Sequence, residues 1–271
     1  MHKFAMSLTV FGVFMREIVD FSSVTEIPGS RATSEQLARL SQRYDFARSF
    51  VEGNRVLEVG CGAGIGLGYL SHTAQQVVGG DYTPALLQVA QKTYHAKLPL
   101  VRLDAHALPF AAYSFDVIIL FEAIYYLTDA FQFVQDSRRV LAPGGILLIG
   151  TVNREWDGFS PSPFSQYYYS QAELFELLME AGFKNIELYG GFPVQKDSIK
   201  QRLIQRVRRV FVTWGLMPKT LQGRAFLKRL VYGKLKPIPA QLTEVSADSP
   251  VPLANPNIVY TILYAVAENT L

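Results

Sequence analysis

Apolar and polar residues follow each other along the middle of the chain as in strands that alternate with helices. Continuously apolar runs, such as VIIL at 117–120 and ILLIG at 146–150, predict central strands that are covered on both faces. Between these runs, apolar residues recur every three or four positions, which predicts amphipathic helices. Strands are expected at 55–59, 76–80, 100–103, 115–120, 145–151, 185–189 and 257–267, and helices at 33–51, 64–71, 84–94, 130–141 and 171–181.

This order of elements predicts an α/β class fold with a doubly wound, seven-stranded, mostly parallel sheet. A long stretch separates the sixth expected strand from the last one, so we expect a helical insertion before the last strand. The expected division is an N-terminal segment (1–32), a core (33–195), a basic helical insertion (196–256) and the last core strand (257–271).

Composition excludes several classes of protein. Of the 271 residues, 49% are hydrophobic and 18% are charged, which is too apolar for intrinsic disorder. No apolar run approaches the roughly 18 residues of a membrane-spanning helix. The single cysteine, Cys61, rules out an intrachain disulfide, so we expect a reducing, cytoplasmic location and no metal site. The apolar segment at 4–15 leaves open a signal peptide, a packing or membrane-touching segment, or a start at Met15.

The net charge of +3 conceals an uneven distribution. Residues 196–236 hold twelve Lys and Arg and one acid, Asp197, a local net charge of +11, whereas the rest of the chain carries −8. Apolar residues at helical spacing predict two basic amphipathic helices, at 196–216 and 221–236. They are interpreted as a lid over a substrate, as a contact with the inner face of a membrane, or as a protein-binding element. Nucleic acid is disfavoured as a partner, because the acidic remainder repels it.

A glycine-rich turn follows the first expected strand of the core. Gly60, Gly62 and Gly64 occupy every second position, which lets the backbone turn sharply and approach a ligand closely, and the next helix offers free N–H groups. The dinucleotide pattern Gly-x-Gly-x-x-Gly is absent, because Ile65, Leu67 or Tyr69 occupies the third glycine position. The turn therefore predicts a cofactor site that is not for nicotinamide dinucleotides.

The acid-x-Gly-x-Gly-x-Gly sequence from Glu58 to Gly64 resembles motif I of the class I S-adenosylmethionine (SAM)-dependent methyltransferases, in particular their small-molecule, type 11-like members. Later landmarks are similar to the same family: Asp81 after the second strand, Asp104-Ala105 after the third, and LAPGG at 141–145. The resemblance covers about residues 55–194. It implies a Rossmann-like fold and SAM as the cofactor.

The resemblance also implies roles for individual residues. Glu58 would orient the loop or meet the methionine amino group, and the glycines around Cys61 would allow close approach. The remaining expected cofactor contacts are Asp81 on the ribose, Tyr82 over the adenine or ribose, Asp104 and Ala105 on the adenine, and Phe121 and Glu122 on the methionine side. Cys61 is not expected to act as a nucleophile.

The catalytic base stays unassigned, because alignment of a nucleophile can supply much of the rate of methyl transfer. Residues 120–123 read LFEA rather than Asn/Asp-Pro-Pro-Tyr/Phe, which disfavours nucleobase and glutamine acceptors. Tyr126 occupies a position where many small-molecule members have histidine; it would orient a substrate or simply pack. His106 would act on substrate or serve as a surface or capping residue.

Aromatic residues in the stretch 153–170 favour an apolar or ring-bearing acceptor. The expected function is SAM-dependent methyl transfer to oxygen, carbon or an amine of a small-molecule or lipid-like acceptor. The alternative is a noncatalytic module of the same fold that binds a membrane or a partner through the basic helices. The sequence does not predict an oligomeric state.

Overall fold

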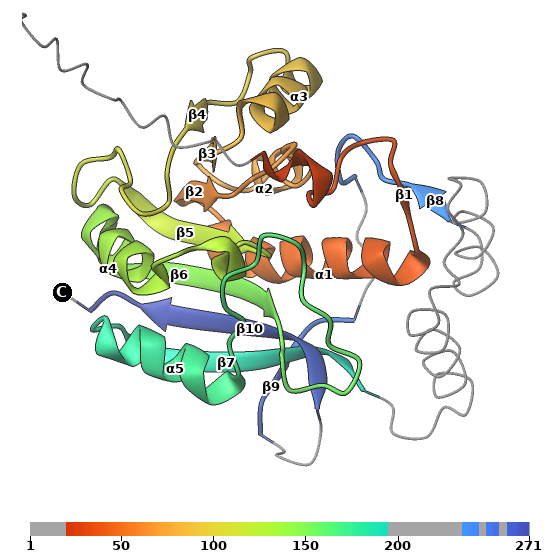
Figure 1. Ribbon diagram of the computed structural model, residues 1–271. Helices are drawn as coiled ribbons and strands as arrows, with labels where there is room; N and C mark the ends of the chain where they lie inside the picture. Colours follow the sequence, from red (N-terminus) through yellow and green to blue (C-terminus); the bar gives the residue numbers. More distant parts are fainter. Residues whose placement is uncertain (1–19, 195–234, 244–247, 255–258, 271) are drawn as a thin grey trace, which may run out of the picture.

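A computed structural model describes residues 20–194, 235–243, 248–254 and 259–270. Its centre is an eight-stranded sheet with the strand order β4-β3-β2-β5-β6-β10-β7-β9 (Figure 1). The strands of this sheet are β2 (Arg55–Val59), β3 (Gln76–Asp81), β4 (Leu100–Arg102), β5 (Phe115–Phe121), β6 (Leu141–Val152), β7 (Lys184–Pro193), β9 (Val251–Pro252) and β10 (Tyr260–Glu268).

The expected mostly parallel, doubly wound sheet is confirmed. β2 pairs in parallel with β3 and with β5, β3 with β4, and β5 with β6, whereas β10 runs antiparallel between β6 and β7. The eighth strand, β9, is the difference from the expected seven. It pairs antiparallel with β7 through Val251 and Pro252, within the stretch 196–256 that the sequence analysis assigns to the helical insertion. Proline is tolerated there because β9 is an edge strand.

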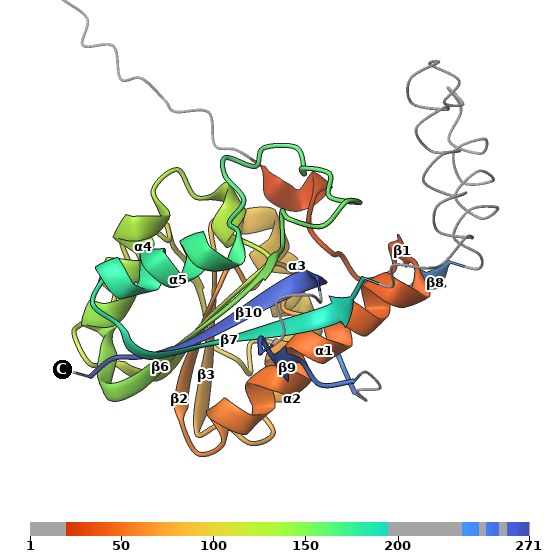
Figure 2. The same cartoon turned by 90° about the horizontal axis from the view of Figure 1, so that it is seen from below.

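Helices cover both faces of the sheet. They are α1 (Ser34–Val51), α2 (Leu67–Leu70), α3 (Pro84–Tyr94), α4 (Ala130–Val140) and α5 (Gln171–Glu180). α4 and α5 lie on one face, and α1 and α2 on the other (Figure 2). On β2, Leu57 joins the core of the α4/α5 face and its neighbour Val56 joins that of the α1 face, both fully buried. Burial on both faces explains the uninterrupted apolar runs.

Two helix starts differ from the sequence prediction. Thr33, the first residue of the helix expected at 33–51, is instead the N-cap of α1: its hydroxyl accepts from the Gln36 N–H, while the Gln36 side chain accepts from the Thr33 N–H. The helix predicted at 64–71 is shorter, because α2 begins at Leu67. Gly64 has a φ of +75°, which a right-handed helix does not allow, so the glycine loop continues further than expected.

Part of the N-terminal segment packs against the core. A short 3-10 helix, η1 (Phe21–Ser23), is followed by β1 (Arg31–Ala32), which pairs antiparallel with β8 (Lys236–Pro237). The predicted amphipathic helices at 196–216 and 221–236 lie outside the described residues, apart from positions 235 and 236. Within the described ranges, no helix is long and apolar enough to cross a bilayer. The proposed domain boundaries stay predictions.

Candidate functional site

A cavity of about 830 Å³ lies at the carboxyl ends of β2, β3 and β5. α1, the segment at 21–26 and the loop at 153–170 complete its wall. Open α/β sheets bind ligands at this edge, where the loops after parallel strands converge. Of the expected site residues, Gly64 alone does not line the cavity; those that do are Glu58, Gly60, Cys61, Gly62, Asp81, Tyr82, Asp104, Ala105, His106, Phe121, Glu122 and Tyr126.

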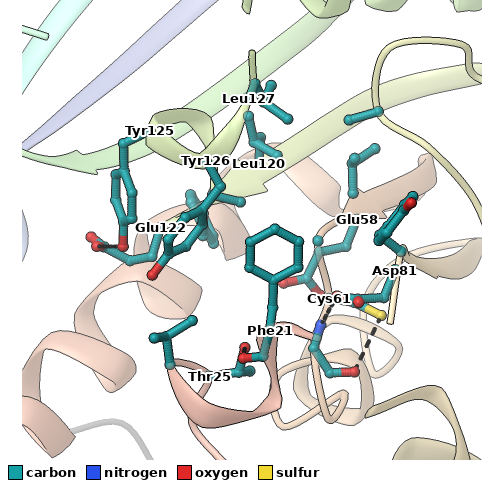
Figure 3. A pocket seen from close by; sticks show the side chains of 18 of the residues that line it. Phe21, Thr25, Glu58, Cys61, Asp81, Leu120, Glu122, Tyr125, Tyr126 and Leu127 are labelled. Atoms are coloured by element: carbon teal, nitrogen blue, oxygen red, sulfur yellow. Dashed lines mark hydrogen bonds between the residues drawn. The ribbon is translucent and has the colours of Figure 1, made fainter. Parts of the chain in front are cut away.

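Figure 3 shows Phe21 between two groups of cavity residues, so we describe the single cavity as two halves, one on each side of this ring. We call one part the glycine-loop half; it comprises Glu58, Gly60, Gly62, Asp81 and Asp104. We call the other part the α1 half; it comprises Glu26, Arg43, Glu122 and Tyr125. The Phe21 ring centroid lies 6.4 Å from that of Tyr82 and 5.2 Å from that of Tyr126, so Phe21 contacts aromatic residues on both sides.

The glycine loop owes its shape to backbone angles that side chains rarely adopt. Gly60, Gly62 and Gly64 have φ values of +70°, +56° and +75°. A Cβ atom on Gly62 would lie 2.8 Å from the Thr25 methyl group, and one on Gly64 would lie 2.9 Å from the Ala90 Cβ. Gly64 is therefore needed for the fold of the loop, whereas Gly60 and Gly62 also present their backbone to the cavity.

Glu58 lies at the base of the loop and is 1% exposed. Its Oε1 accepts a hydrogen bond of 2.6 Å from the Tyr44 hydroxyl, while its buried Oε2 has no hydrogen-bond partner among the residues that the structure describes. Burial raises the pKa of Glu58 to about 7, and the hydrogen bond from Tyr44 and the charge of Arg43 act in the opposite direction. A buried acceptor without a partner is costly, which is consistent with a site that a ligand completes.

Asp81 connects the end of β3 to the glycine loop. Its Oδ2 accepts from the Gly62 N–H at 2.8 Å and its Oδ1 from the Thr83 N–H at 2.7 Å. Burial raises the pKa of Asp81, although these backbone bonds act in the opposite direction. Each carboxylate oxygen can accept a second hydrogen bond, so this side chain can still bind a ligand hydroxyl.

Asp104 and His106 form a linked pair beside the third parallel strand. Asp104 Oδ1 lies 2.9 Å from the His106 backbone N and 2.6 Å from Nδ1. The Asp129 N–H donates to His106 Nε2 at 3.3 Å, so Nδ1 carries the proton in this tautomer. Both ring nitrogens are therefore engaged. The structure places His106 as a link from Asp104 to the N-cap of α4, in the cavity wall.

The α1 half contains Glu122 in a strained backbone conformation. Glu122 has a φ of +53°, and its N–H donates to the Gly150 carbonyl at 2.8 Å. Its Oε2 accepts from the Tyr125 hydroxyl at 3.0 Å. Burial raises the pKa of Glu122, while nearby Arg43 acts in the opposite direction. Strain of this kind at a cavity is typical of functional residues.

Tyr126 faces the loop at 153–170. Its hydroxyl and the Ser162 hydroxyl are 2.8 Å apart, and burial raises the pKa of Tyr126. This phenol stays protonated at neutral pH, so it can donate a hydrogen bond but does not serve as a base. Within the loop, Tyr168 stacks on Tyr125 in the core, whereas Phe164 lines the cavity and remains 50% exposed. The aromatic stretch thus divides between packing and the cavity.

Sequence reasoning missed the residues that reach the cavity from the N-terminal segment and α1. Glu26 and Arg43 form an ion pair, and the Arg43 side chain is 12% exposed. Phe21 and Thr25 come from the same N-terminal segment. Tyr44 is one of the apolar positions of the predicted helix at 33–51, but this pattern does not predict the hydrogen bond of its hydroxyl to Glu58. No local sequence pattern marks Phe21 or Glu26.

Comparisons with known proteins agree with this geometry. Residues 57–149 match the family model described as a methyltransferase domain. A probable S-adenosylmethionine-dependent methyltransferase of Mycolicibacterium smegmatis is 34% identical over 61% of this chain and 66% of its own length. A phthiotriol/phenolphthiotriol dimycocerosates methyltransferase of Mycobacterium ulcerans is 36% identical over 57% of this chain and 55% of its own. The matches thus span about half to just under two thirds of these relatives.

Solved structures share the fold. A SAM-dependent methyltransferase of Thermotoga maritima aligns with a TM-score of 0.56 and 16% identity, over 86% of this chain and 90% of its own. The [4+2]-cyclase SpnF aligns with a TM-score of 0.54 and 16% identity, over 89% and 84%. Because one of these proteins is a cyclase, the fold alone does not determine the reaction.

Residues 57–149 thus match a methyltransferase domain, and a relative that is 34% identical is named as probably SAM-dependent. SAM is the cofactor of this domain type. The glycine-loop half fits such a ligand. Its glycines leave space for the close approach of a ligand, Glu58 offers an acceptor that is unpartnered within the described part of the chain, and Asp81 has lone pairs for hydroxyl groups.

Proposed function

We propose that this protein transfers a methyl group from SAM to an oxygen, carbon or amine nitrogen of a small-molecule or lipid-like acceptor. The observation that carries the proposal is the glycine-loop half, in which Glu58 and Asp81 meet the glycine turn at the ends of neighbouring parallel strands. Relatives named as SAM-dependent methyltransferases support it.

In this proposal, the glycine-loop half holds the cofactor. Glu58 orients the loop or receives the methionine amino group, and Asp81 binds the ribose beside Tyr82. Asp104 and Ala105 contact the adenine, with His106 fixing the Asp104 carboxylate through its Nδ1. Phe121 is assigned to the methionine side, whereas Glu122, which was also expected there, is assigned to the acceptor.

When bound, SAM supplies a methyl group on a sulfonium, which already has a good leaving group. The chain therefore has to orient the acceptor, exclude water and accept a proton. Glu122 is the proposed proton acceptor, because its carboxylate lines the α1 half and the Tyr125 hydroxyl fixes one of its two oxygens. Neither Tyr126, with its raised pKa, nor His106, with both nitrogens engaged, offers this function.

The α1 half is proposed to receive the acceptor. Carboxylates and Arg43 line its interior, while Phe21, Tyr126 and Phe164 form an aromatic wall. This combination suits a molecule with a polar reacting end and an apolar or ring-bearing body. The relative named for dimycocerosates is compatible with a lipid-like acceptor.

Titration calorimetry with SAM and S-adenosylhomocysteine tests the cofactor site. We expect micromolar binding, and at least a 100-fold loss in Asp81→Ala, because the ribose acceptor and the Gly62 contact disappear together. Asp116→Asn is the matched control: Asp116 pairs with Arg55, at the start of β2, and should bind within twofold of the unmodified chain. Absence of binding in the unmodified protein would refute the proposal.

A second measurement tests methyl transfer. The protein is incubated with SAM carrying a radioactive methyl group and with organic and aqueous small-molecule extracts of cells. We expect the label to enter extractable molecules. A protein that binds SAM but labels no molecule in either extract would contradict the catalytic assignment and favour the noncatalytic alternative.

A further inference from the structure

Two tyrosines hold the glycine loop from outside the loop itself. Tyr94 is the last residue of α3 and is 7% exposed. Its hydroxyl donates to the Gly64 carbonyl at 2.6 Å and accepts from the Gly68 N–H at 2.9 Å. Burial raises the pKa of Tyr94 to about 12, so the hydroxyl keeps its proton for the first of these bonds.

The Tyr94 hydroxyl, which links the Gly64 carbonyl to the Gly68 N–H, supplies hydrogen bonds that the backbone itself would provide if α2 were longer. α2 has four residues, and Gly68 lies in its first turn, where N–H groups have no intrahelical partner. Gly64 sits in a left-handed conformation just before this turn. Because glycine loses more conformational freedom on folding than any other residue, a loop built on it needs external contacts to keep one shape.

Tyr44 is a residue of α1 that contacts the glycine loop on both sides, at Glu58 before the loop and at Gly66 after it. Its hydroxyl donates to Glu58 Oε1 at 2.6 Å, and the side chain is almost fully buried. Its ring lies against Gly66: a Cβ atom there would come within 1.9 Å of Tyr44 Cε1. Tyr44 thus fixes both the acidic residue before the loop and the backbone after it.

We propose that Tyr44 and Tyr94 are positioning residues for the cofactor, which keep the glycine loop in the conformation that receives SAM. The inference rests on the proposed function and extends it to two side chains on α1 and α3. Tyr94 does not line the cavity, and Tyr44 lines it but does not have to touch the ligand. Each acts through hydrogen bonds to the groups that do, or to the loop that carries them.

The two tyrosines should act in different ways. Tyr44 bonds to the Glu58 carboxylate, whose pKa burial raises to about 7, and its hydrogen bond stabilises the ionised form. Of the charged groups near Glu58, Arg43 lowers this pKa and Asp81 raises it. Removal of the Tyr44 hydroxyl should therefore raise the pKa of Glu58 further. Tyr94 bonds to neutral backbone groups, so its removal should change the affinity without a change in the pH profile.

Calorimetry with S-adenosylhomocysteine between pH 6 and 8.5 tests this difference on the full chain. In the unmodified protein, affinity should rise with pH through about 7, because the ionised Glu58 attracts the ligand's ammonium group. Tyr94→Phe should weaken binding about tenfold at every pH, the loss of about 1.4 kcal/mol. Tyr44→Phe should weaken binding about tenfold at pH 7 and move the midpoint to higher pH.

Tyr69→Phe is the matched control, because its hydroxyl bonds to Asp45, away from residues 58–66. It should bind within twofold of the unmodified protein. Glu58→Gln is a second variant that should abolish the pH dependence. Circular dichroism and thermal unfolding identify any variant that fails to fold, in which case the other tyrosine variant and Glu58→Gln decide.

The outcomes separate the two proposals. If the unmodified protein does not bind S-adenosylhomocysteine, the proposed function fails. If it binds and both tyrosine variants bind within twofold, the positioning inference is wrong. A Tyr44→Phe variant that loses affinity but keeps its midpoint would overturn the action of Tyr44 through the Glu58 charge.

Discussion

The two halves of the cavity are built by different means. In the glycine-loop half, the key residues lie at or just after the carboxyl ends of parallel strands, and backbone N–H groups hold Asp81 in place. In the α1 half, Glu122 and Tyr125 still follow a parallel strand, β5, but Glu26 and Arg43 come from segments outside these strands and form an ion pair with each other. The first half is determined mainly by the backbone of the fold, and the second by contacts between side chains.

This difference suggests that one half of the cavity determines cofactor affinity and the other determines which acceptor is used. A half that depends on sheet topology can stay constant while loops and terminal segments around the other half change, as is common where loops surround a rigid scaffold. We therefore expect substitutions in the glycine-loop half to affect cofactor affinity, and substitutions in the α1 half to affect turnover or stability with little change in that affinity.

The largest expected effect is on turnover in the α1 half. Glu122→Gln should lower the rate of methyl transfer at least 100-fold, because an amide side chain cannot take the proton that the methylated molecule loses. Its affinity for S-adenosylhomocysteine should stay within threefold. The rate of the unmodified protein should rise with pH through the raised pKa of Glu122, since the carboxylate must be ionised to act.

Labelled methyl transfer to the acceptor pool measures this rate across pH. Glu180→Gln, on the exposed surface of α5, is the control and should retain full activity. Retention of more than a tenth of the rate in Glu122→Gln would eliminate this residue as the proton acceptor. A parallel loss of cofactor affinity would instead place Glu122 in the cofactor site.

The second largest effect is expected for Gly62→Ala, which tests the contact between the glycine loop and the N-terminal segment. Gly62→Ala combines a φ of +56° with a Cβ only 2.8 Å from the Thr25 methyl group. It should cost about 1–2 kcal/mol of stability and weaken S-adenosylhomocysteine binding about tenfold. Adding Thr25→Ser removes the methyl group and should recover part of the affinity, but not the cost of the backbone angle.

Gly53→Ala is the matched control for this test. Gly53 has a φ of +70°, but a Cβ there would meet no atom within 4 Å. It should lose similar stability and keep its affinity, as measured by urea unfolding and calorimetry. Equal affinities in Gly62→Ala and Gly53→Ala would show that the loop tolerates a side chain beside Thr25.

The fold was predictable because its signals are local. Residues 84–94 form the predicted helix without any shift of its ends, since Pro84 and the apolar periodicity mark it directly. The predicted start of α2 at residue 64 was wrong, because α2 begins at Leu67. Gly64 adopts a left-handed conformation, which the periodicity of apolar residues does not reveal. β9 was missed because two residues are too few for any periodic signal.

The residues of the site were likewise predictable where the signal is local and unpredictable where it depends on tertiary packing. Glu58 and Asp81 were predictable as cavity residues, since the carboxyl ends of parallel strands meet at one edge. Arg43 occupies a position that a helical pattern marks as polar and therefore solvent-facing, yet the N-terminal segment covers it. The bond between Tyr94 and the glycine loop likewise depends on how α3 packs, not on spacing along the chain.

The smallest expected effect on the cofactor comes from the Glu26–Arg43 pair. Glu26→Gln leaves the mostly buried Arg43 without its ion-pair partner. Unfolding free energy should fall by about 1 kcal/mol, less than for a fully buried pair because Glu26 is partly exposed. Affinity for S-adenosylhomocysteine should change less than twofold, since the pair belongs to the α1 half.

Glu35→Gln provides the control for this change. Glu35 pairs with Arg39, one turn before Arg43 on α1, but its side chain is 62% exposed. Such a surface pair contributes at most about 0.5 kcal/mol, so urea unfolding should separate the two variants. If Glu26→Gln weakened cofactor binding tenfold, the Glu26–Arg43 pair would act on both halves of the cavity. The separation of the two halves would then have to be abandoned.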